Sequence, residues 1–290
     1  MDFQKNLPLP VTDVSEECYK RQLYVYNFGV HNVSTIKSVM YLYAETFGSK
    51  SANEVLSCLD DFITNNKHRE HTRLEVFADN AFGQNKNRYV WGYFQHIALK
   101  GVFEEVVLFY PLPGHSMMPI DRDFGAVERR RKRYQCVHLP DTYVEIISTA
   151  RQTNPFEICF VNYPLRSTLT CLPGDRIVFA KDFKTALGEK LRVNVPVMKA
   201  RSVKFTRAEM PQKRESMTGD FSSFNLCKTG HSLRTISLQY SPRDFVAIKE
   251  KKVEDVKSLL QYIKPCDRQC NFFESVVAQE GLGSDIDEFE

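Results

Sequence analysis

The sequence lacks a long apolar run and a strong excess of either charge. No stretch is apolar and long enough to cross a bilayer, and no secretory signal opens the chain, so neither a membrane-embedded nor a secreted protein is expected. The net charge of +3 is too small to indicate a nucleic-acid partner by itself. Hydrophobic residues at 42% and charged residues at 26% are typical of folded chains. We therefore expect a globular protein of the nucleus or cytoplasm.

Cysteine clusters of the zinc-binding kind are also missing. The 8 cysteines are scattered singly, apart from Cys266 and Cys270, and that pair has no second pair or histidine cluster nearby. Reduced structural thiols are therefore expected, as in an intracellular protein. The sequence also contains no internal repeat and no low-complexity tract.

The first 135 residues alternate between strand and helix patterns. If Phe3 belongs to one further strand, the order is β-β-β-α-β-α-β-α, which is that of ribonuclease H-like folds. Such a mixed sheet places the ends of its first and fourth strands side by side. The expected strands lie at 19–30, 37–45, 74–79 and 104–110. One helix is expected to start at Ser51 or Asn53, a second to run from about 89 to 101, and a third from about 121 to 133.

The pattern changes after residue 136, where short strands predominate. We predict a ribonuclease H-like core over 1–135, a β-rich α+β extension of unknown role over 136–275, and an acidic disordered tail over 276–290. Within the extension the expected elements are helices at 141–150 and 253–263, strands at 156–162, 176–179, 191–198, 203–205 and 235–240, and a mobile polar loop at 208–223.

Residues 73–87 are the most informative stretch. An apolar strand pattern ends near Phe77 and runs into Asp79, and a small polar loop at 80–87 precedes a helix. A carboxylate at the tip of a buried strand is held rigidly at the sheet edge where ligands of open α/β sheets bind. Asp79 is therefore a candidate metal ligand, and the alternative is that it only caps the turn.

Other acids stand at similar positions in the expected core. Asp2 falls where the first strand would end, or else belongs to a frayed terminus. Glu54 lies near the start of an amphipathic helix, where a surface acid is also favoured. Asp121 is a ligand candidate or an N-cap, and Glu128 follows on the same helix. His115 is placed to orient a ligand or relay a proton, or is a hydrogen-bonded structural residue.

Carboxylates that meet at one point repel each other unless a cation neutralises them. Hard oxygen ligands suit Mg²⁺ or Mn²⁺ rather than zinc, and two such ions can activate water and stabilise the leaving oxygen in phosphodiester chemistry. We expect Asp2, Asp79 and Asp121 to be the metal ligands. The acids and the histidine together form the candidate catalytic set: Asp2, Glu54, Asp79, Asp121, Glu128 and His115.

Basic and amide side chains supply candidate contacts to nucleic acid. Arg129, Arg130 and Arg131 belong to a dense basic run, which is either a solvated helix face or a contact to a phosphate backbone. Lys86 is a further candidate for a phosphate contact. Gln84 and Asn85 are candidates for positioning the nucleic-acid backbone.

Several motifs resemble those of an uncharacterised family of transposable-element-derived animal domains, a domain of unknown function. The resemblance covers residues 1–165 well and 235–275 loosely. One departure is that Ser49 to Ala52 replace the Arg-Gly that family members commonly carry before the helix glutamate, which falls on Glu54 here. The motifs are Leu-Pro-Leu-Pro, Tyr-Lys-Arg-Gln-Leu, Tyr-Asn-Phe-Gly-Val-His, Asn-Glu-Val-Leu-Ser-Cys-Leu, Asp-Asn-Ala-Phe-Gly-Gln-Asn-Lys-Asn and Gly-His-Ser-(x4)-Asp-(x6)-Glu.

The resemblance implies a ribonuclease H-like transposase or integrase core. Asp2, Glu54, Asp79 and Asp121 match in type and order the four carboxylates of ribonuclease H-type nucleases. The expected activity is metal-dependent cleavage or strand transfer on nucleic acid, DNA rather than RNA, by a homo-oligomer. The alternative is a catalytically silent, domesticated module that binds nucleic acid or protein. Relatives usually carry a DNA-binding region upstream, so we expect a fragment or a domesticated copy.

Overall fold

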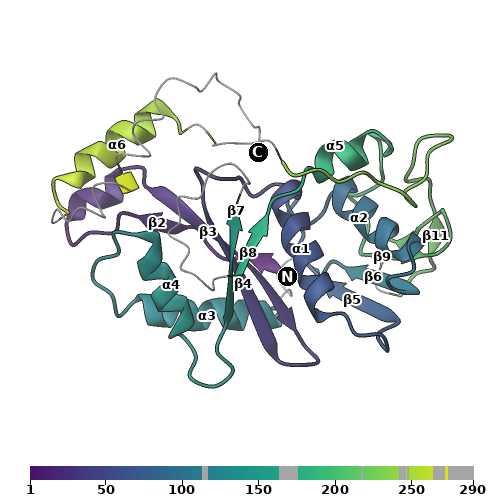
Figure 1. Ribbon diagram of the computed structural model, residues 1–290, viewed down its shortest axis with the longest axis horizontal. Helices are drawn as coiled ribbons and strands as arrows, with labels where there is room; N and C mark the ends of the chain where they lie inside the picture. Colours follow the sequence, from purple (N-terminus) through teal and green to yellow (C-terminus); the bar gives the residue numbers. More distant parts are fainter. Residues whose placement is uncertain are drawn as a thin grey trace. The chain divides into compact units, whose positions relative to one another are not determined.

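The computed structural model describes residues 1–112, 117–162, 176–216, 218–241, 246, 248–263 and 272–273 (Figure 1). The chain forms two compact units, each made of segments that are distant in sequence. Unit 1 comprises 1–2, 50–121 and 178–242, and unit 2 comprises 3–49, 122–177 and 243–290. Each unit takes residues from both sides of the boundary expected near residue 136. The predicted tail at 276–290 lies outside the described residues.

The first sheet has the strand order β1-β3-β4-β7-β8, and β2 pairs with β3 as well. The β3–β4 pair is antiparallel and the β4–β7 pair is parallel, so the sheet is mixed. The bounds of these strands are β1 (Asp2–Phe3), β2 (Leu7–Leu9), β3 (Leu23–Asn32), β4 (Lys37–Ala44), β7 (Glu157–Asn162) and β8 (Arg176–Phe179). The strands expected at 74–79 and 104–110 lie in the second sheet instead, so the single mixed sheet that was predicted is divided in two.

The β3–β4 hairpin forms because its turn chemistry and its strand patterns agree. The side-chain oxygen of Asn32 accepts hydrogen bonds from the backbone nitrogens of Ser34 (3.0 Å) and Thr35 (3.3 Å), which stabilises the turn. Every residue of β4 after Lys37 is buried, as expected of an inner strand that is covered on both faces. The strands expected at 19–30 and 37–45 are therefore confirmed, and they pair as a hairpin.

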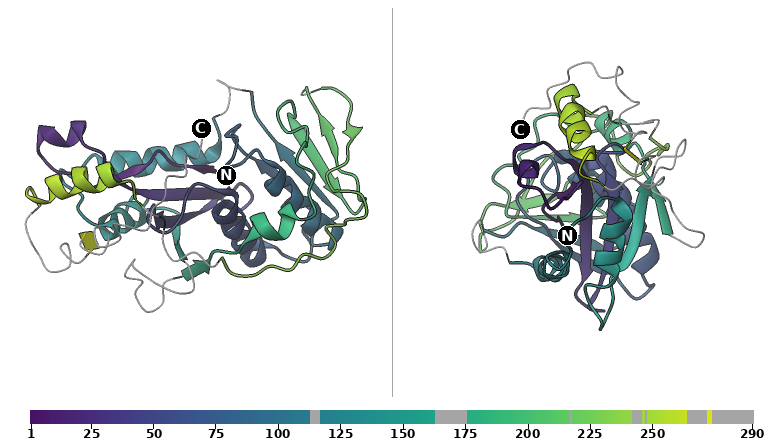
Figure 2. Two further views of the ribbon diagram at one scale, coloured as in Figure 1. Left: turned by 90° about the horizontal axis from the view of Figure 1, so that it is seen from above. Right: turned by 90° about the vertical axis from the view of Figure 1, so that its left-hand side faces the viewer.

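The second sheet lies in unit 1 and has the order β5-β6-β9-β10-β11. β5 and β6 are parallel, and β9 and β10 continue the sheet in antiparallel fashion, as Figure 2 shows. Its members are β5 (Arg73–Phe77), β6 (Glu105–Phe109), β9 (Ser202–Thr206), β10 (Gln212–Arg214) and β11 (Ser222–Ser223).

Helices α1 (Ala52–Asn66), α2 (Arg88–Leu99) and α5 (Phe183–Gly188) pack together in unit 1, and α2 contacts β6 and β9 (Figure 1). Asn87 caps α2, since its side-chain oxygen accepts from the backbone nitrogens of Tyr89 and Val90. Burial of each large side chain of this core stabilises the fold by about 1.5–3 kcal/mol. The core includes Trp91, Phe94, Val106, Leu108 and Phe205, all with 0% exposure.

The remaining elements are η1 (Ser15–Tyr19), α3 (Pro119–Arg131), α4 (Pro140–Ser148) and α6 (Glu250–Leu260). The predicted helices near these positions are confirmed, with ends shifted by one to three residues. Within the described ranges, no helix combines the length and apolarity that a membrane crossing requires.

Three predictions in the second half of the chain are wrong. Residues 191–198 and 235–240 are not strands; each contributes only an isolated bridge, at Leu191 and at Tyr240. The alternating valines at 193–197 imitate a strand, but no neighbouring strand pairs with them. The expected loop at 208–223 instead contains β10 and β11, whose polar sequences carry no apolar alternation and whose structure depends on pairing with β9.

Candidate acidic site at the end of β5

Asp79 stands just beyond the carboxyl end of β5, as the sequence predicts. The backbone nitrogen of the fully buried Ala78 donates to the carbonyl oxygen of Phe109 at 3.1 Å, which fixes the chain beside the end of β6. Asp79 itself is half-buried. Its Oδ1 accepts a hydrogen bond from the backbone nitrogen of Ala81 at 3.2 Å, so the carboxylate also caps the turn that follows.

The side-chain amide of Asn85 joins Asp79 to Asp2. Its Nδ2 lies 2.7 Å from Oδ1 of Asp79 and 3.4 Å from Oδ1 of Asp2. Asp2 is held there because the preceding residue, Met1, donates its backbone nitrogen to the carbonyl oxygen of Phe77 at 2.9 Å. One buried amide therefore sits between two carboxylates.

Asp121 contributes to the electrostatic field at the same place. Burial lowers the pKa of the Met1 amine to about 6, and three carboxylates oppose this lowering, those of Asp2, Asp79 and Asp121. Oδ2 of Asp121 also accepts from the backbone nitrogen of Met118 at 2.6 Å, at the start of α3, so its capping role is present as well. We call Asp2, Asp79 and Asp121 the acidic site.

Lys50 is a residue of this site that the sequence did not reveal. Burial lowers the pKa of the Lys50 ammonium, and the nearby carboxylates of Asp2 and Asp79 oppose that shift. The side chain is half-buried and precedes the helix cap Ser51. Nothing in the local pattern separates it from an ordinary surface lysine, because its proximity to the acids exists only in the folded chain.

Asn85 carries a second unexpected feature. Its residue is 0% exposed, and its side-chain Oδ1 is buried without a hydrogen-bond partner among the described residues. A buried acceptor that is left unpaired costs about 1–3 kcal/mol. The predicted contact of Asn85 with a nucleic-acid backbone stays a prediction, and in the structure its amide nitrogen is engaged by the acidic site.

Other predicted catalytic residues have different surroundings. Glu54 on α1 is fully buried, and its carboxylate accepts a hydrogen bond from the hydroxyl of Ser51. Glu128 belongs to unit 2, where it accepts from the side-chain amide of Gln4 at 2.8 Å. His115 lies outside the described residues.

The Lys86 side chain is directed into unit 1. Its ammonium donates to Oδ1 of Asn80 (2.9 Å) and to the carbonyl oxygen of Met198 (3.2 Å), and it lies 4.8 Å from the centre of the Tyr110 ring. Burial, followed by the positive charge of Arg201, lowers the pKa of Lys86 to about 8. Lys86 as a whole is 2% exposed in the structure. Its predicted contact with a phosphate stays a prediction.

The remaining nucleic-acid candidates differ in exposure. Arg129 is exposed on α3, Arg130 donates to the hydroxyl of Thr149 at 3.0 Å, and Arg131 hydrogen-bonds Tyr143. Of these three arginines, Arg129 is the one that lies on the solvent-exposed face of α3. Gln84 is half-buried, and its backbone carbonyl accepts from the side chain of Asn87 at 2.9 Å.

The acidic site offers carboxylate and amide oxygens as possible ligands for a divalent cation. Carboxylate and amide oxygens are the ligands that Mg²⁺ and Mn²⁺ prefer. Across the ranges that the structure describes, however, no group of three His, Cys, Asp or Glu side chains is close enough to hold a metal ion. In chemical type alone, the oxygen atoms of Asp2, Asp79 and Asn85 fit such an ion.

The comparisons with known proteins identify the family and nothing closer. The model of a family described as a domain of unknown function, DUF7869, matches residues 16–172. This match spans more than half of the chain, so the protein belongs to that family. The matched range includes Glu54, Asp79 and Asp121. No curated protein and no solved structure matches the chain.

Proposed function

We propose that this DUF7869 protein processes nucleic acid through metal-dependent phosphodiester cleavage or strand transfer. Its core would be ribonuclease H-like and derived from a transposable element, with DNA as the substrate. The observation that carries the proposal is the buried amide of Asn85, which lies between the carboxylates of Asp2 and Asp79. Such an arrangement concentrates negative charge around a polar group that can serve either as donor or as acceptor.

The positions of the acids along the fold support this proposal. Asp79 follows β5, which is parallel to β6, and ligands of open α/β sheets bind at the carboxyl ends of such strands. Asp2 is brought to the same end by the hydrogen bond from Met1 to Phe77. Asp121 comes from the first turn of α3. Asp2 and Asp79 therefore lie on either side of one amide, and Asp121 is near enough to act on the Met1 amine.

Asn85 would change its role when a cation binds. In the structure its amide nitrogen donates to the carboxylates, and its oxygen has no partner among the described residues. Rotation of the amide by half a turn would exchange the two groups and direct the oxygen toward the acidic site. Asp2, Asp79 and Asn85 would then hold Mg²⁺ or Mn²⁺ together with Asp121, and the bound ion would supply positive charge and an activated water.

The chain's own groups would fix the carboxylates for this task. The backbone nitrogen of Ala81 donates to one oxygen of Asp79, and that of Met118 donates to one oxygen of Asp121. The orientation of both side chains is therefore set before a ligand arrives. The predicted catalytic roles of Glu54 and Glu128, and of His115 in relaying a proton, stay predictions.

The direct test is metal-dependent cleavage or strand transfer of DNA by the purified protein. We expect activity with Mn²⁺ or Mg²⁺ that is lost in Asp79→Asn and Asp121→Asn. Asp220→Asn is the matched control, because it removes an exposed carboxylate of unit 1 away from these contacts. Unchanged activity in Asp79→Asn would refute the assignment, provided that circular dichroism shows a folded variant.

The second candidate function is a catalytically silent module that binds nucleic acid or protein. Lys50 favours it, because an ammonium near Asp2 and Asp79 supplies the positive charge that a metal ion would otherwise provide. A silent module would bind nucleic acid in the presence of a chelator, and Asp79→Asn would leave that binding unchanged or improve it. Loss of metal-dependent cleavage in the folded Asp79→Asn variant would exclude this alternative.

A further inference from the structure

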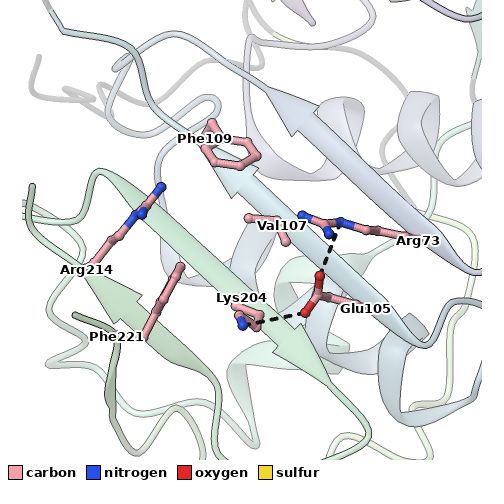
Figure 3. A pocket seen from close by; sticks show the side chains of 7 residues that line it. All are labelled: Arg73, Glu105, Val107, Phe109, Lys204, Arg214 and Phe221. Carbon is pink, nitrogen blue, oxygen red and sulfur yellow. Dashed lines mark ion pairs between the residues drawn. The ribbon is translucent and has the colours of Figure 1, made fainter. Parts of the chain in front are cut away.

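The sheet of unit 1 has one covered face and one open face. Successive residues of a strand point to opposite faces. On one face Val106, Leu108 and Phe205 are fully buried, where α2 contacts β6 and β9. The other face holds a hollow, shown in Figure 3, which the acidic site does not use. We call this the open face, and the side chains that line its hollow are Arg73, Glu105, Val107, Phe109, Lys204, Arg214 and Phe221.

Phenylalanine rings form part of the open face. Phe77 and Phe109 are register partners across β5 and β6, and their rings stack with centroids 4.9 Å apart and planes at 15°. Phe77 retains 46% exposure, which is high for a large apolar side chain in a strand. Burying this ring under a ligand would remove apolar area from water, and its π-face offers a stacking surface for another planar group.

Two cationic groups lie against a third ring of the open face, that of Phe221. The Lys204 ammonium and the Arg214 guanidinium lie 4.9 Å and 5.0 Å from the centre of the Phe221 ring. Arg214 comes from β10, and its Nε donates to the hydroxyl of Ser202, the register partner of Phe109. The phenylalanine end of the open face therefore combines aromatic rings with positive charge.

The other end of the open face is closer to electrical neutrality. Arg73 pairs with Glu75 (2.7 Å) and with Glu105 (3.2 Å), and Lys204 lies 3.6 Å from Glu105. Arg214 is then the cation of the hollow that has no ion pair with any described residue. A partner with planar rings and negative charge would match the phenylalanine end.

We propose that the open face binds single-stranded nucleic acid. Unpaired bases would stack on Phe77 and Phe109, and Arg214 would contact the phosphates. A single strand fits better than a duplex because paired bases are stacked on each other and do not expose their faces. DNA and RNA share the chemistry that the face recognises, so the binding assay compares both.

The position of the open face connects it with the acidic site. Phe77 is the last residue of β5 and precedes Asp79 by two residues. A nucleic acid bound at the phenylalanine end would therefore run beside the carboxylates. This link rests on the proposed function. The binding itself does not, because stacking and phosphate contacts require no divalent ion.

The test is fluorescence anisotropy of labelled oligothymidine and oligouridine of about 15 nucleotides, titrated with the full chain in a chelator. We expect saturable binding of at least one oligonucleotide, and weaker binding of a duplex. Phe77→Ala should weaken the affinity about tenfold, and Arg214→Gln should weaken it and reduce its salt dependence. Tyr19→Ala is the matched control, since it removes an aromatic ring that is 88% exposed in unit 2.

The outcomes separate this proposal from the proposed function. Binding lost in Phe77→Ala but retained in Asp79→Asn supports a stacking face even if no cleavage is found. Absence of binding to either oligonucleotide, or equal affinity of Phe77→Ala and wild type, overturns the proposal even if metal-dependent cleavage is found. Concentration-dependent dimerisation that Phe77→Ala abolishes also overturns it, because the face would then bind a second copy of the chain.

Discussion

Asp79 in unit 1 and Asp123 in unit 2 are carboxylates with opposite surroundings. Asp123 is 5% exposed, and each of its oxygens has a partner. Oδ1 accepts from Arg151 at 2.9 Å, while Oδ2 lies 2.7 Å from Nδ1 of His31 and accepts from the hydroxyl of Ser38 at 2.6 Å. This carboxylate is therefore neutralised within the fold.

Asp79, by contrast, accepts hydrogen bonds from neutral groups, and no charged hydrogen-bond donor to it is found among the described residues. Within the ranges that the structure describes, its hydrogen-bond donors are the neutral amide of Asn85 and the backbone nitrogen of Ala81, and its neighbours include the carboxylates of Asp2 and Asp121. Lys50 offsets part of this charge at longer range. The comparison teaches that residue type alone does not assign a role: Asp123 is neutralised within unit 2, whereas the hydrogen-bond donors to Asp79 are neutral groups.

The largest expected effect comes from removing the charge of Asp123. Asp123→Asn would leave the Arg151 guanidinium without its buried counter-charge, so we expect the free energy of unfolding to fall by about 3 kcal/mol. Urea unfolding followed by circular dichroism measures the loss, with Asp220→Asn as the control. A loss below about 1 kcal/mol would show that Asp123 is not a structural anchor.

A smaller effect is expected from the pH dependence that Lys86 contributes to unit 1. Its pKa is about 8 in the folded chain against 10.5 as the ordinary value, so between these pH values the unfolded chain binds more protons. Stability should therefore rise with pH in this window, by about 2 kcal/mol between pH 8 and pH 10. Lys86→Met should lack this part of the rise in unfolding experiments at the two pH values. Equal pH dependence of variant and wild type would contradict the assignment.

The smallest effect is predicted for the stability of Asp79→Asn without metal. The substitution keeps the shape of the side chain and removes repulsion from Asp2 and Asp121, so the melting temperature should stay constant or rise slightly, with a change below about 1 kcal/mol in stability. Thermal unfolding in a chelator measures it. A destabilisation as large as that of Asp123→Asn would mean that the two carboxylates play the same structural role.

Sequence patterns located what depends on neighbours in the chain. The strand that leads to Asp79, the helix that carries Glu54 and the hairpin β3–β4 all follow from local periodicity and turn residues. Asp2, Asp79 and Asp121 were singled out because each stands at the end or start of an element. These features were within reach of sequence reasoning, although the convergence of the acids was expected only through the predicted fold.

Features that depend on distant partners were missed. Lys50 and the amide of Asn85 meet the acids only after folding, and Lys86 turns inward because its loop closes over Tyr110. The open face requires β9 and β10 to extend the sheet beyond β6. The Gln-Lys-Arg sequence of β10 shows no strand periodicity, so the position of Arg214 beside Phe221 could not be predicted.

The central claim, that the acidic site is a cation site, is tested most directly by calorimetric titration of Mn²⁺ and Mg²⁺ into the full chain. We predict saturable binding of Mn²⁺ or Mg²⁺ that is lost in Asp79→Asn and weakened in Asn85→Ala, while Asp220→Asn binds as wild type does. Absence of binding at millimolar metal, or equal binding by wild type and Asp79→Asn, would contradict the account.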